Sequence, residues 1–173
     1  RTIAFQHFTE ARNIAAPNTV RPVHQFAASG IEGSVDLSLS PKGSGALTAH
    51  VADNAFGGNK RGAYAVDWQM GRTQASQVSS GDFSTNSGGN ANTASGPYSS
   101  NSGGNANTTN GIFSSNGGGS NNTASGYLSS NGGGNNNTAS GDFSSNGGGS
   151  NNIASGDFSS NGGGNSNTAS GYG

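Results

Sequence analysis

The sequence is short of cysteine, of charge and of long apolar runs, and each absence narrows the choice of function. Its 173 residues include no cysteine, only 9% are charged, and the net charge is −1. Without cysteine, neither a disulfide framework nor a cysteine-based metal site can form. No run of 18 apolar residues occurs, so we expect no membrane-spanning segment. No signal peptide is visible.

Positive charge is missing from the second half of the chain. After Arg72 there is no Lys or Arg, and Asp82, Asp142 and Asp157 are the only charged residues. A protein that binds nucleic acid needs a basic stripe to neutralise phosphates. We therefore expect no nucleic-acid partner for this half.

What the sequence does contain is a repeat with a period of 15 residues from Gly81 to Gly173. Six full copies and the start of a seventh follow the pattern G-D-F-S-S-N-G-G-G-S-N-N-T-A-S, as in residues 141–155. Position 3 holds Phe83, Tyr98, Phe113, Leu128, Phe143 and Phe158, position 6 holds Asn86, Asn101, Asn116, Asn131, Asn146 and Asn161, and position 12 is also asparagine. A short fixed period predicts a solenoid in which each copy stacks on the last.

The composition of the repeat favours a coil of short strands. Glycine and asparagine are poor helix formers, and no apolar spacing of three or four residues persists. The glycines at positions 8 and 9 allow positive φ or close backbone approach at corners, and two brief runs between corners suit two strands per copy. Disorder is the alternative, because linkers share this composition. Linkers do not hold aromatic and asparagine columns in register, so we predict like residues stacked on like.

One large apolar side chain per copy is too little to offset the entropy of ordering 15 residues. A second stabilising surface is required, and other copies of the same chain are the simplest source. The repeat therefore predicts a homo-oligomer, most simply three chains around a fibre axis. At about 4.8 Å per copy, six copies would form roughly 29 Å of shaft.

The first residues of the chain predict short strands and one helical turn. Ile3 and Phe5 alternate as in a strand, and residues 9–16 suit a helical turn. Residues 18–29 read as a strand interrupted at Pro22, which places that strand at a sheet edge.

Apolar and polar residues alternate over 35–40 and again over 46–51, and a turn at 41–45 that contains Pro and Gly joins the two stretches. We therefore predict a β-hairpin. Residues 63–79 suit either a short helix broken at Gly71 or an extended connector. The predicted organisation is a β-rich unit at 1–62, a connector at 63–80 and a repeat shaft at 81–173. Because the chain begins at Arg1 and stops inside a repeat, we expect it to belong to a longer polypeptide.

Few residues carry the chemistry that a catalytic or metal site needs. The three histidines are far apart: His7, His24 and His50. Asp142 and Asp157 share position 2 of adjacent copies, where two carboxylates can approach as in glycosidases, but the same position elsewhere holds Pro, Ile and Tyr. The calcium-binding G-G-x-G-x-D motif is missing, and no lysine follows the glycine corners as in a phosphate loop. We therefore expect no enzyme activity, no catalytic residue, no metal and no cofactor.

Three stretches resemble phage tail-fibre proteins. They are V-D-L-S-L-S-P-K-G-S-G-A-L at 35–47, G-G-N-K-R-G-A-Y-A-V-D-W-Q at 57–69, and Arg72 followed by A-S-Q-V-S-S-G at 75–81. The repeat is similar to the YadA-like head repeats of trimeric autotransporter adhesins, which tail fibres share. The resemblance spans roughly residues 18–173. It implies a homotrimer, a β-rich N-terminal unit leading into a parallel β-roll, and a role in attachment to a host surface.

The repeat departs from those relatives at position 6. Related repeats usually carry Val or Ile near the position of Asn146, whereas this column is asparagine throughout. If the column faces inward, the interior is polar; if it faces outward, the aromatic column supplies the core. The second arrangement is favoured, because three aspartates directly precede aromatics and strand alternation places Asp outside and Phe inside.

The sequence therefore predicts an all-β homotrimeric fibre, a virion tail-fibre segment that projects a receptor-binding tip. Expected partners are the chain itself, other tail or baseplate proteins, and a host receptor, with carbohydrate a candidate, bound through regions beyond this segment. Tyr98 and Tyr127 are the rings that would stack on a sugar here. The alternative is the head of a bacterial surface adhesin at the cell surface, and a third possibility is a depolymerising tailspike, which requires acids clustered in a groove.

Overall fold

The computed structural model describes residues 8–13, 23–28, 39, 41–55 and 57–172, and within these the protein is all-β. The chain divides into two compact units, residues 1–40 and 41–173. In the first unit, β1 (Phe8–Asn13) pairs antiparallel with β2 (Val23–Ala28). The helical turn predicted over residues 9–16 is wrong as far as Asn13, and a strand after Pro22 is confirmed. Ile3, Phe5 and His7 lie outside the described residues.

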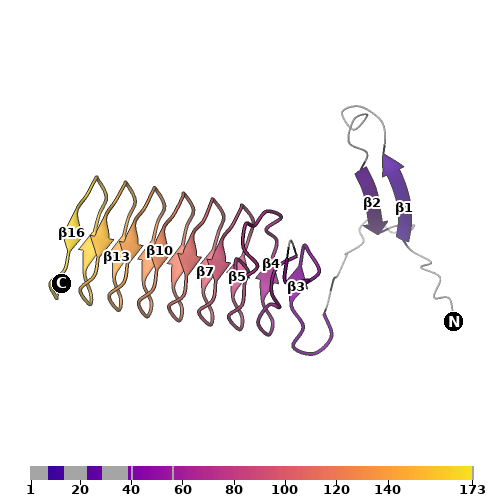
Figure 1. Ribbon diagram of the computed structural model, residues 1–173, viewed down its shortest axis with the longest axis horizontal. Coiled ribbons are helices and arrows are strands. Elements are labelled where there is room, and N and C mark those ends of the chain that lie inside the picture. The colour runs from indigo at the N-terminus through magenta and orange to yellow at the C-terminus, as the bar shows by residue number, and fades with distance from the viewer. Residues whose placement is uncertain (1–7, 14–22, 29–38, 40, 56, 173) are drawn as a thin grey trace. The chain divides into compact units, whose positions relative to one another are not determined.

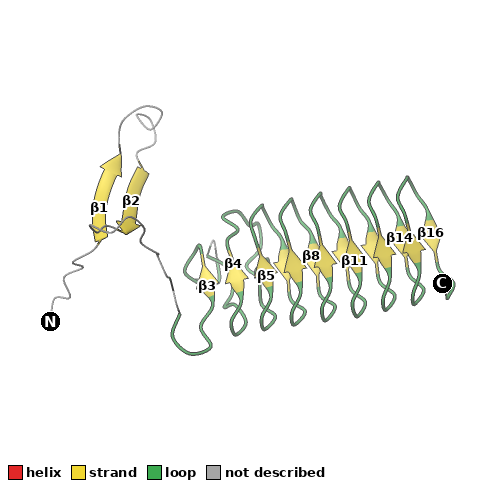
Figure 2. Ribbon diagram, turned by 180° about the vertical axis from the view of Figure 1, so that it is seen from behind, coloured by secondary structure: helices red, strands yellow, loops and turns green. Residues whose placement is uncertain are grey.

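The second unit is a parallel β-solenoid of about eight turns (Figures 1 and 2). One sheet contains β3 (Leu47–Thr48), β4 (Val66–Asp67), β5 (Thr85–Asn86), β7 (Ser100–Asn101), β9 (Ser115–Asn116), β11 (Ser130–Asn131), β13 (Ser145–Asn146) and β15 (Ser160–Asn161). The other contains β6 (Thr93–Ala94), β8 (Thr108–Thr109), β10 (Thr123–Ala124), β12 (Thr138–Ala139), β14 (Ile153–Ala154) and β16 (Thr168–Ala169).

Equivalent positions of successive copies lie directly on one another. Ser130 pairs with Ser145 and Thr123 with Thr138, and a third line of single bridges joins position 10 from Asn90 onward. Stacking of like on like, predicted from the period, is confirmed. Each 15-residue copy contributes only two residues to each sheet, because glycines and residues at positive φ bend the chain between the strands.

The solenoid begins well before the 15-residue repeat. Its register advances by 19 residues from Leu47 to Val66 and again to Thr85, then by 15 to Ser100. Residues 63–80 are therefore a turn of the coil rather than a connector, and the coil includes part of the predicted N-terminal unit at 1–62. The stretch G-A-Y-A-V-D at 62–67 matches G-D-F-S-T-N at 81–86 position by position, so the longer loop alone conceals this turn in the sequence.

Within the described residues, Leu47–Thr48 is not paired in the hairpin predicted over residues 35–51. These two residues bond in parallel to Val66–Asp67, one turn further along the chain. The turn at 41–45 is present, closed by a hydrogen bond from the Gly45 N–H to the Lys42 carbonyl (3.2 Å). Of residues 35–40, only Leu39 is among the described residues, and it is exposed.

The interior of the solenoid is polar, contrary to the orientation favoured from the sequence. The asparagines of position 6 are buried, with Asn86, Asn101 and Asn116 at 0% exposure, and so are those of position 12 from Asn92 to Asn152. Buried apolar residues are small: Val78 and a set of alanines that includes Ala94 and Ala139. The aromatic column lies outside instead.

The asparagines of position 6 form a continuous ladder along the axis. The side-chain amide of Asn146 donates to the side-chain carbonyl of Asn131 (2.9 Å) and to the backbone carbonyl of Thr138 (2.8 Å), both in the preceding turn. The carbonyl of Asn146 then accepts from Asn161 (2.9 Å). Since each amide finds partners inside the coil, burial of this polar column does not leave its hydrogen-bonding groups unpaired.

The asparagines of position 12 stabilise the glycine corner. The Asn137 amide donates to the carbonyl of Gly133 in its own turn (2.8 Å) and to that of Gly149 in the next (3.1 Å). Its side-chain carbonyl accepts the backbone N–H of Asn152 (3.0 Å). One asparagine therefore links strands, corner and neighbouring turn, which accounts for an asparagine in every copy.

The aromatic residues point outward because position 3 belongs to a corner and not to a strand. Positions 1 to 4 form a tight turn, in which the Ser144 N–H donates to the Gly141 carbonyl (3.3 Å). Phe143, the third residue of that turn, has φ of 56°. The alternation that the sequence suggested for Asp142 and Phe143 applies to strands alone, and here the strand starts two residues later, at Ser145.

Two glycine positions are dictated by the stacking. Gly149 has φ of 85°, and a Cβ there would lie 2.0 Å from the carbonyl oxygen of Gly164. At position 1, a Cβ on Gly141 would lie 2.2 Å from the carbonyl oxygen of Gly156. Neighbouring turns approach too closely at these corners for any side chain, so the period of the glycines follows from the period of the coil.

Replacing Asn146 by alanine should weaken the solenoid severely. The change leaves the Asn131 side-chain carbonyl without its partner and takes one hydrogen bond each from the Thr138 carbonyl and from the Asn161 amide, which keeps its bond to the Ile153 carbonyl. At about 1–3 kcal/mol for each buried group, we expect a loss of roughly 3–5 kcal/mol in urea unfolding followed by circular dichroism. Ser144→Ala is the control, because the buried Ser144 hydroxyl has no hydrogen-bond partner, and it should be neutral or stabilising. Equal losses in the two variants would contradict the ladder.

Ala106→Asn should stabilise the coil by about 0.5–1 kcal/mol. Ala106 has φ of 56°, and copies further along the chain carry Asn121 and Asn136 at the same position and φ. Asparagine tolerates this left-handed conformation better than alanine. The midpoint of thermal unfolding, compared at equal protein concentration, should rise, whereas a lower midpoint would show that strain at this corner is unimportant.

Candidate functional site

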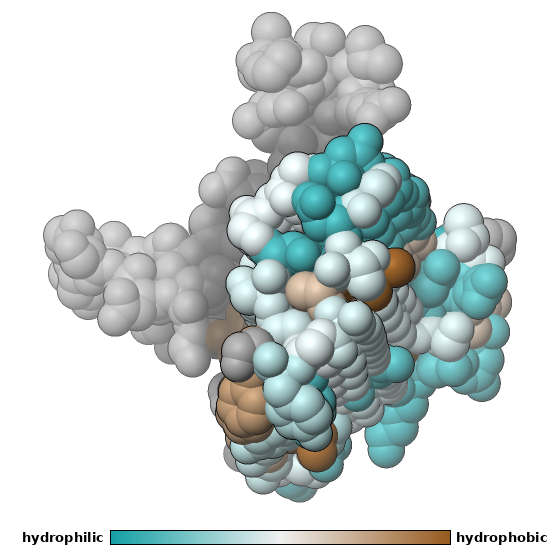
Figure 3. All heavy atoms as spheres, turned by 90° about the vertical axis from the view of Figure 1, so that its left-hand side faces the viewer, coloured by the Kyte–Doolittle hydropathy of each residue, from teal (hydrophilic) through white to brown (hydrophobic). Residues whose placement is uncertain are grey.

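An exposed aromatic stripe runs along one corner of the solenoid and is the main candidate for an interaction surface. We define the aromatic stripe as the apolar residues at positions 2 and 3: Tyr64, Phe83, Tyr98, Ile112, Phe113, Tyr127, Leu128, Phe143 and Phe158. Each of these side chains is between 40% and 59% exposed. Seen along the solenoid from the end that carries β16, the visible described surface is mostly hydrophilic or neutral, with a few brown apolar patches (Figure 3).

The rings of the stripe stack on one another. Centroids lie 4.8 Å apart for Tyr64 and Phe83, 4.9 Å for Phe83 and Tyr98, and 4.8 Å for Tyr98 and Phe113, with planes within 17° of parallel. Leu128 interrupts the column, and Tyr127 bridges the gap edge-on to Phe113 and Phe143. The ring spacing follows from the separation of stacked strands.

Stacking offsets the strain of the corner. A side chain at positive φ costs about 1–2 kcal/mol, and all position-3 residues have φ between 53° and 58°. A stacked aromatic pair returns about 0.5–1.5 kcal/mol beyond area burial. The two terms are of similar size, so the column persists at a position where glycine or asparagine would be expected.

The acids of position 2 lie along the stripe and bond to the backbone. The Asp157 carboxylate accepts the Asp142 N–H (2.9 Å), and the Asp142 carboxylate accepts the Tyr127 N–H (2.9 Å). Asp82 accepts the Ala63 N–H in the same way (2.8 Å). These carboxylates therefore cap the backbone of the preceding turn, which supports the interpretation that they are structural.

A buried charge cluster lies at the N-terminal end of the solenoid. The Arg61 Nε donates to the Asp67 carboxylate (2.7 Å), and the Arg72 guanidinium approaches the same oxygen (3.5 Å). Asp67 occupies the ladder position of Asn86, and Gln69 accepts the N–H of Asn92 (2.8 Å). Burial lowers the pKa of Arg72, and the charge of Asp67 opposes that change. Asp67 therefore lies one turn before the first ladder asparagine, and Gln69 bonds to the first asparagine of the position-12 column.

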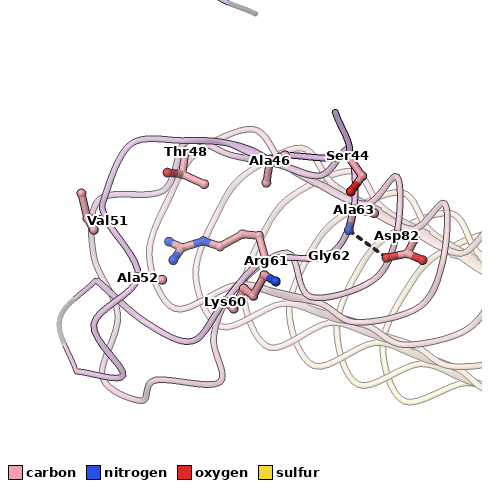
Figure 4. A pocket seen from close by; sticks show the side chains of 11 residues that line it. Ser44, Ala46, Thr48, Val51, Ala52, Lys60, Arg61, Gly62, Ala63 and Asp82 are labelled. Atoms are coloured by element: carbon pink, nitrogen blue, oxygen red, sulfur yellow. Dashed lines mark hydrogen bonds between the residues drawn. The ribbon is translucent and has the colours of Figure 1, made fainter. Parts of the chain in front are cut away.

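A cavity of about 630 Å³ opens beside this cluster and is lined by Thr48, Val51, Lys60, Arg61 and Asp82 among others (Figure 4). Arg61 is already bonded to Asp67 and also donates to the carbonyl of Gly57 (2.6 Å). Asp82 is bonded to Ala63. Arg61 and Asp82 therefore already bond to other groups of the protein. The described lining of the cavity contains no pair of charged groups placed to act on a substrate.

Other groups give no sign of a reactive centre in the part of the chain that the structure describes. No three His, Cys, Asp or Glu side chains there are placed to hold a metal ion, and no helix there is long and apolar enough to cross a membrane. The N–H of Ala55 donates to the Asp53 carboxylate (2.8 Å), and this bond lowers the pKa of Asp53. It organises an exposed loop.

The stripe contains more residues than the sequence predicted. Position 3 was expected as a column, and it is one, but on the outside. Tyr64 extends it one turn beyond the repeat, while Ile112 and Tyr127 widen it from position 2. The match of residues 62–67 to 81–86 identifies Tyr64 in retrospect, because Tyr64 aligns with Phe83.

Asp67→Asn should destabilise the N-terminal end of the coil by about 3 kcal/mol or more. The substitution keeps the shape but removes the negative charge of the buried carboxylate that lies against the Arg61 and Arg72 guanidinium groups. Urea unfolding monitored by Trp68 fluorescence measures the effect in the affected turn. Lys60→Ala, a change at an exposed residue of the same loop, is the control and should alter stability by less than about 0.5 kcal/mol. A neutral Asp67→Asn variant would contradict the role of the ion pair.

Comparison with known proteins gives no match to a family model, to a curated protein or to a solved structure. The candidate site is therefore defined by geometry alone: a regular coil, a stripe of exposed rings, and a capped charge cluster. Function has to be inferred from what such a surface can do.

Proposed function

We propose that this chain is a shaft segment of a homotrimeric tail fibre of a phage or phage-like particle, which carries a receptor-binding tip toward a host surface. The observation that carries the proposal is the aromatic stripe on an otherwise regular, mostly uncharged coil. A shaft of several chains needs such an uninterrupted surface along its length, and the fibre resemblance of residues 35–81 accords with it. The partners are other copies of the chain, tail or baseplate proteins, and a host receptor engaged elsewhere in the fibre.

Rigidity is the property that a shaft requires, and the coil supplies it. Backbone bonds join every pair of adjacent turns, for example from Ser145 N–H to Ser159 carbonyl (2.9 Å) and from Ile153 N–H to Asn167 carbonyl (2.8 Å). The two asparagine columns add side-chain bonds along the same axis. Since bending would break several of these bonds at once, the segment resists bending and holds its two ends at a fixed separation.

The head of a bacterial trimeric adhesin is the second candidate, because its repeats are similar to this one. An adhesin head and a tail-fibre shaft would both be trimers of such coils. They differ in the structure that anchors the chain, a bacterial cell surface or a phage particle. A depolymerising tailspike is the least supported of the three, since the carboxylates of Asp142 and Asp157 bind backbone N–H groups rather than facing a groove.

The proposal predicts a specific assembly. In sedimentation equilibrium, the chain should have about three times its mass of 16.9 kDa, and negative-stain electron microscopy should show thin rods. Antibodies against residues 81–173 should label tail fibres of particles produced by the source cell. Labelling of the cell envelope instead would favour the adhesin, and cleavage of polysaccharide by the purified chain would favour the tailspike.

A further inference from the structure

We propose that the aromatic stripe is the surface through which copies of this chain pack, parallel and in register, with like turns facing each other. The inference rests on the proposed function for the number and direction of the chains. It adds that the aromatic stripe is the surface that faces the axis of the fibre, whereas the proposed trimer alone does not say which surface does.

The area of the stripe is that of a stable interface. A large aromatic side chain has roughly 150–250 Å² of surface, and the nine members are about half exposed, which gives roughly 650–1,100 Å². A standard interface takes about 800 Å² from each partner, whereas the largest apolar patch of a typical monomer is about 300–600 Å². The other exposed apolar side chains of the coil, such as Trp68 and Met70, occur in single turns.

The shape of the stripe favours another solenoid as the occupant. Exposed rings recur at 4.8–5.0 Å where they stack, and only a partner with the same repeat can match them over the whole length. A second copy of the chain has the same ring spacing, because it has the same sequence and fold. The stripe also lies on a corner rather than on a flat sheet face. Two corners touch along a line, while three corners enclose a core in which each contacts both others.

The orientation of the rings argues against a sugar as the occupant. A sugar stacks on the face of an aromatic ring, but both faces of Tyr98 are covered by Phe83 and Phe113. Only ring edges are available in that part of the column, and edges suit packing against other side chains. The carboxylates of position 2 are held by backbone N–H groups of the preceding turn, so they lie along the stripe at its margin.

The test replaces stripe residues with one that the corner backbone accepts. In Phe113→Asn/Phe143→Asn, asparagine tolerates the positive φ of both positions, so the coil should remain folded by circular dichroism. We expect its dissociation constant, measured by sedimentation, to rise at least 100-fold. The control is Asn121→Gly/Asn151→Gly, which alters the other left-handed corner of the same two turns and should assemble as wild type does.

Register is tested with single cysteines, since the chain has none of its own. Ile112→Cys, exposed on the stripe, should form a disulfide between copies under mild oxidation. A mixture of Ile112→Cys chains and differently tagged Asp157→Cys chains, three turns apart, should give like pairs and almost no mixed pairs. This readout supports the stripe even if the double asparagine variant fails to fold.

The outcomes separate this inference from the proposed function. A wild-type trimer whose stripe variant assembles equally tightly overturns the stripe and leaves the trimer standing, and so do mixed disulfides as abundant as like ones. A wild-type chain that stays folded and monomeric overturns the trimer itself. If that monomer binds a glycan and the stripe variant does not, the stripe is a sugar site instead.

Discussion

The structure depends on hydrogen bonds between buried asparagine side chains and the turns above and below them. The buried side chains of the 15-residue copies are almost all alanine, serine and asparagine, so the interior has to satisfy polar groups. Asn146 and Asn137 meet this constraint because an amide has both donors and an acceptor, so that one side chain can bond to two turns. Polar groups inside a fold are costly only when they are unpaired.

The same geometry decides the outer surface. With the interior occupied by small and amide side chains, the one large apolar residue of each copy has no space inside, and the tight turn places it on a corner at positive φ. Stacking between turns stabilises Phe83, Tyr98 and their equivalents but leaves about half of each ring exposed. The proposed assembly follows from this division: hydrogen bonds hold each coil together, and apolar surface is left for contacts between coils.

The N-terminal end shows how the columns begin. Asp67 occupies the place of the first ladder asparagine, and Arg61 and Arg72 neutralise it where no earlier turn supplies an amide. Gln69 reaches the N–H of Asn92 with a side chain one methylene longer than asparagine, as a 19-residue turn requires. One Asp67 carboxylate oxygen is bonded to Arg61 and the other is buried without a partner, so this end departs from the hydrogen bonds of the ladder, while the backbone register continues through it.

The 15-residue period, the stacking of like residues and the all-β class follow from the sequence alone, because glycine spacing and invariant columns are local consequences of a repeating backbone. The sequence also indicated an asparagine column but favoured an outward direction for it, which the structure reverses. Only the tertiary structure placed Asn146 inside and Phe143 outside, since the direction of a side chain at a corner depends on φ and not on alternation. It likewise showed that residues 63–80 form a turn of the coil, because a loop of different length disrupts the period but not the hydrogen-bond register.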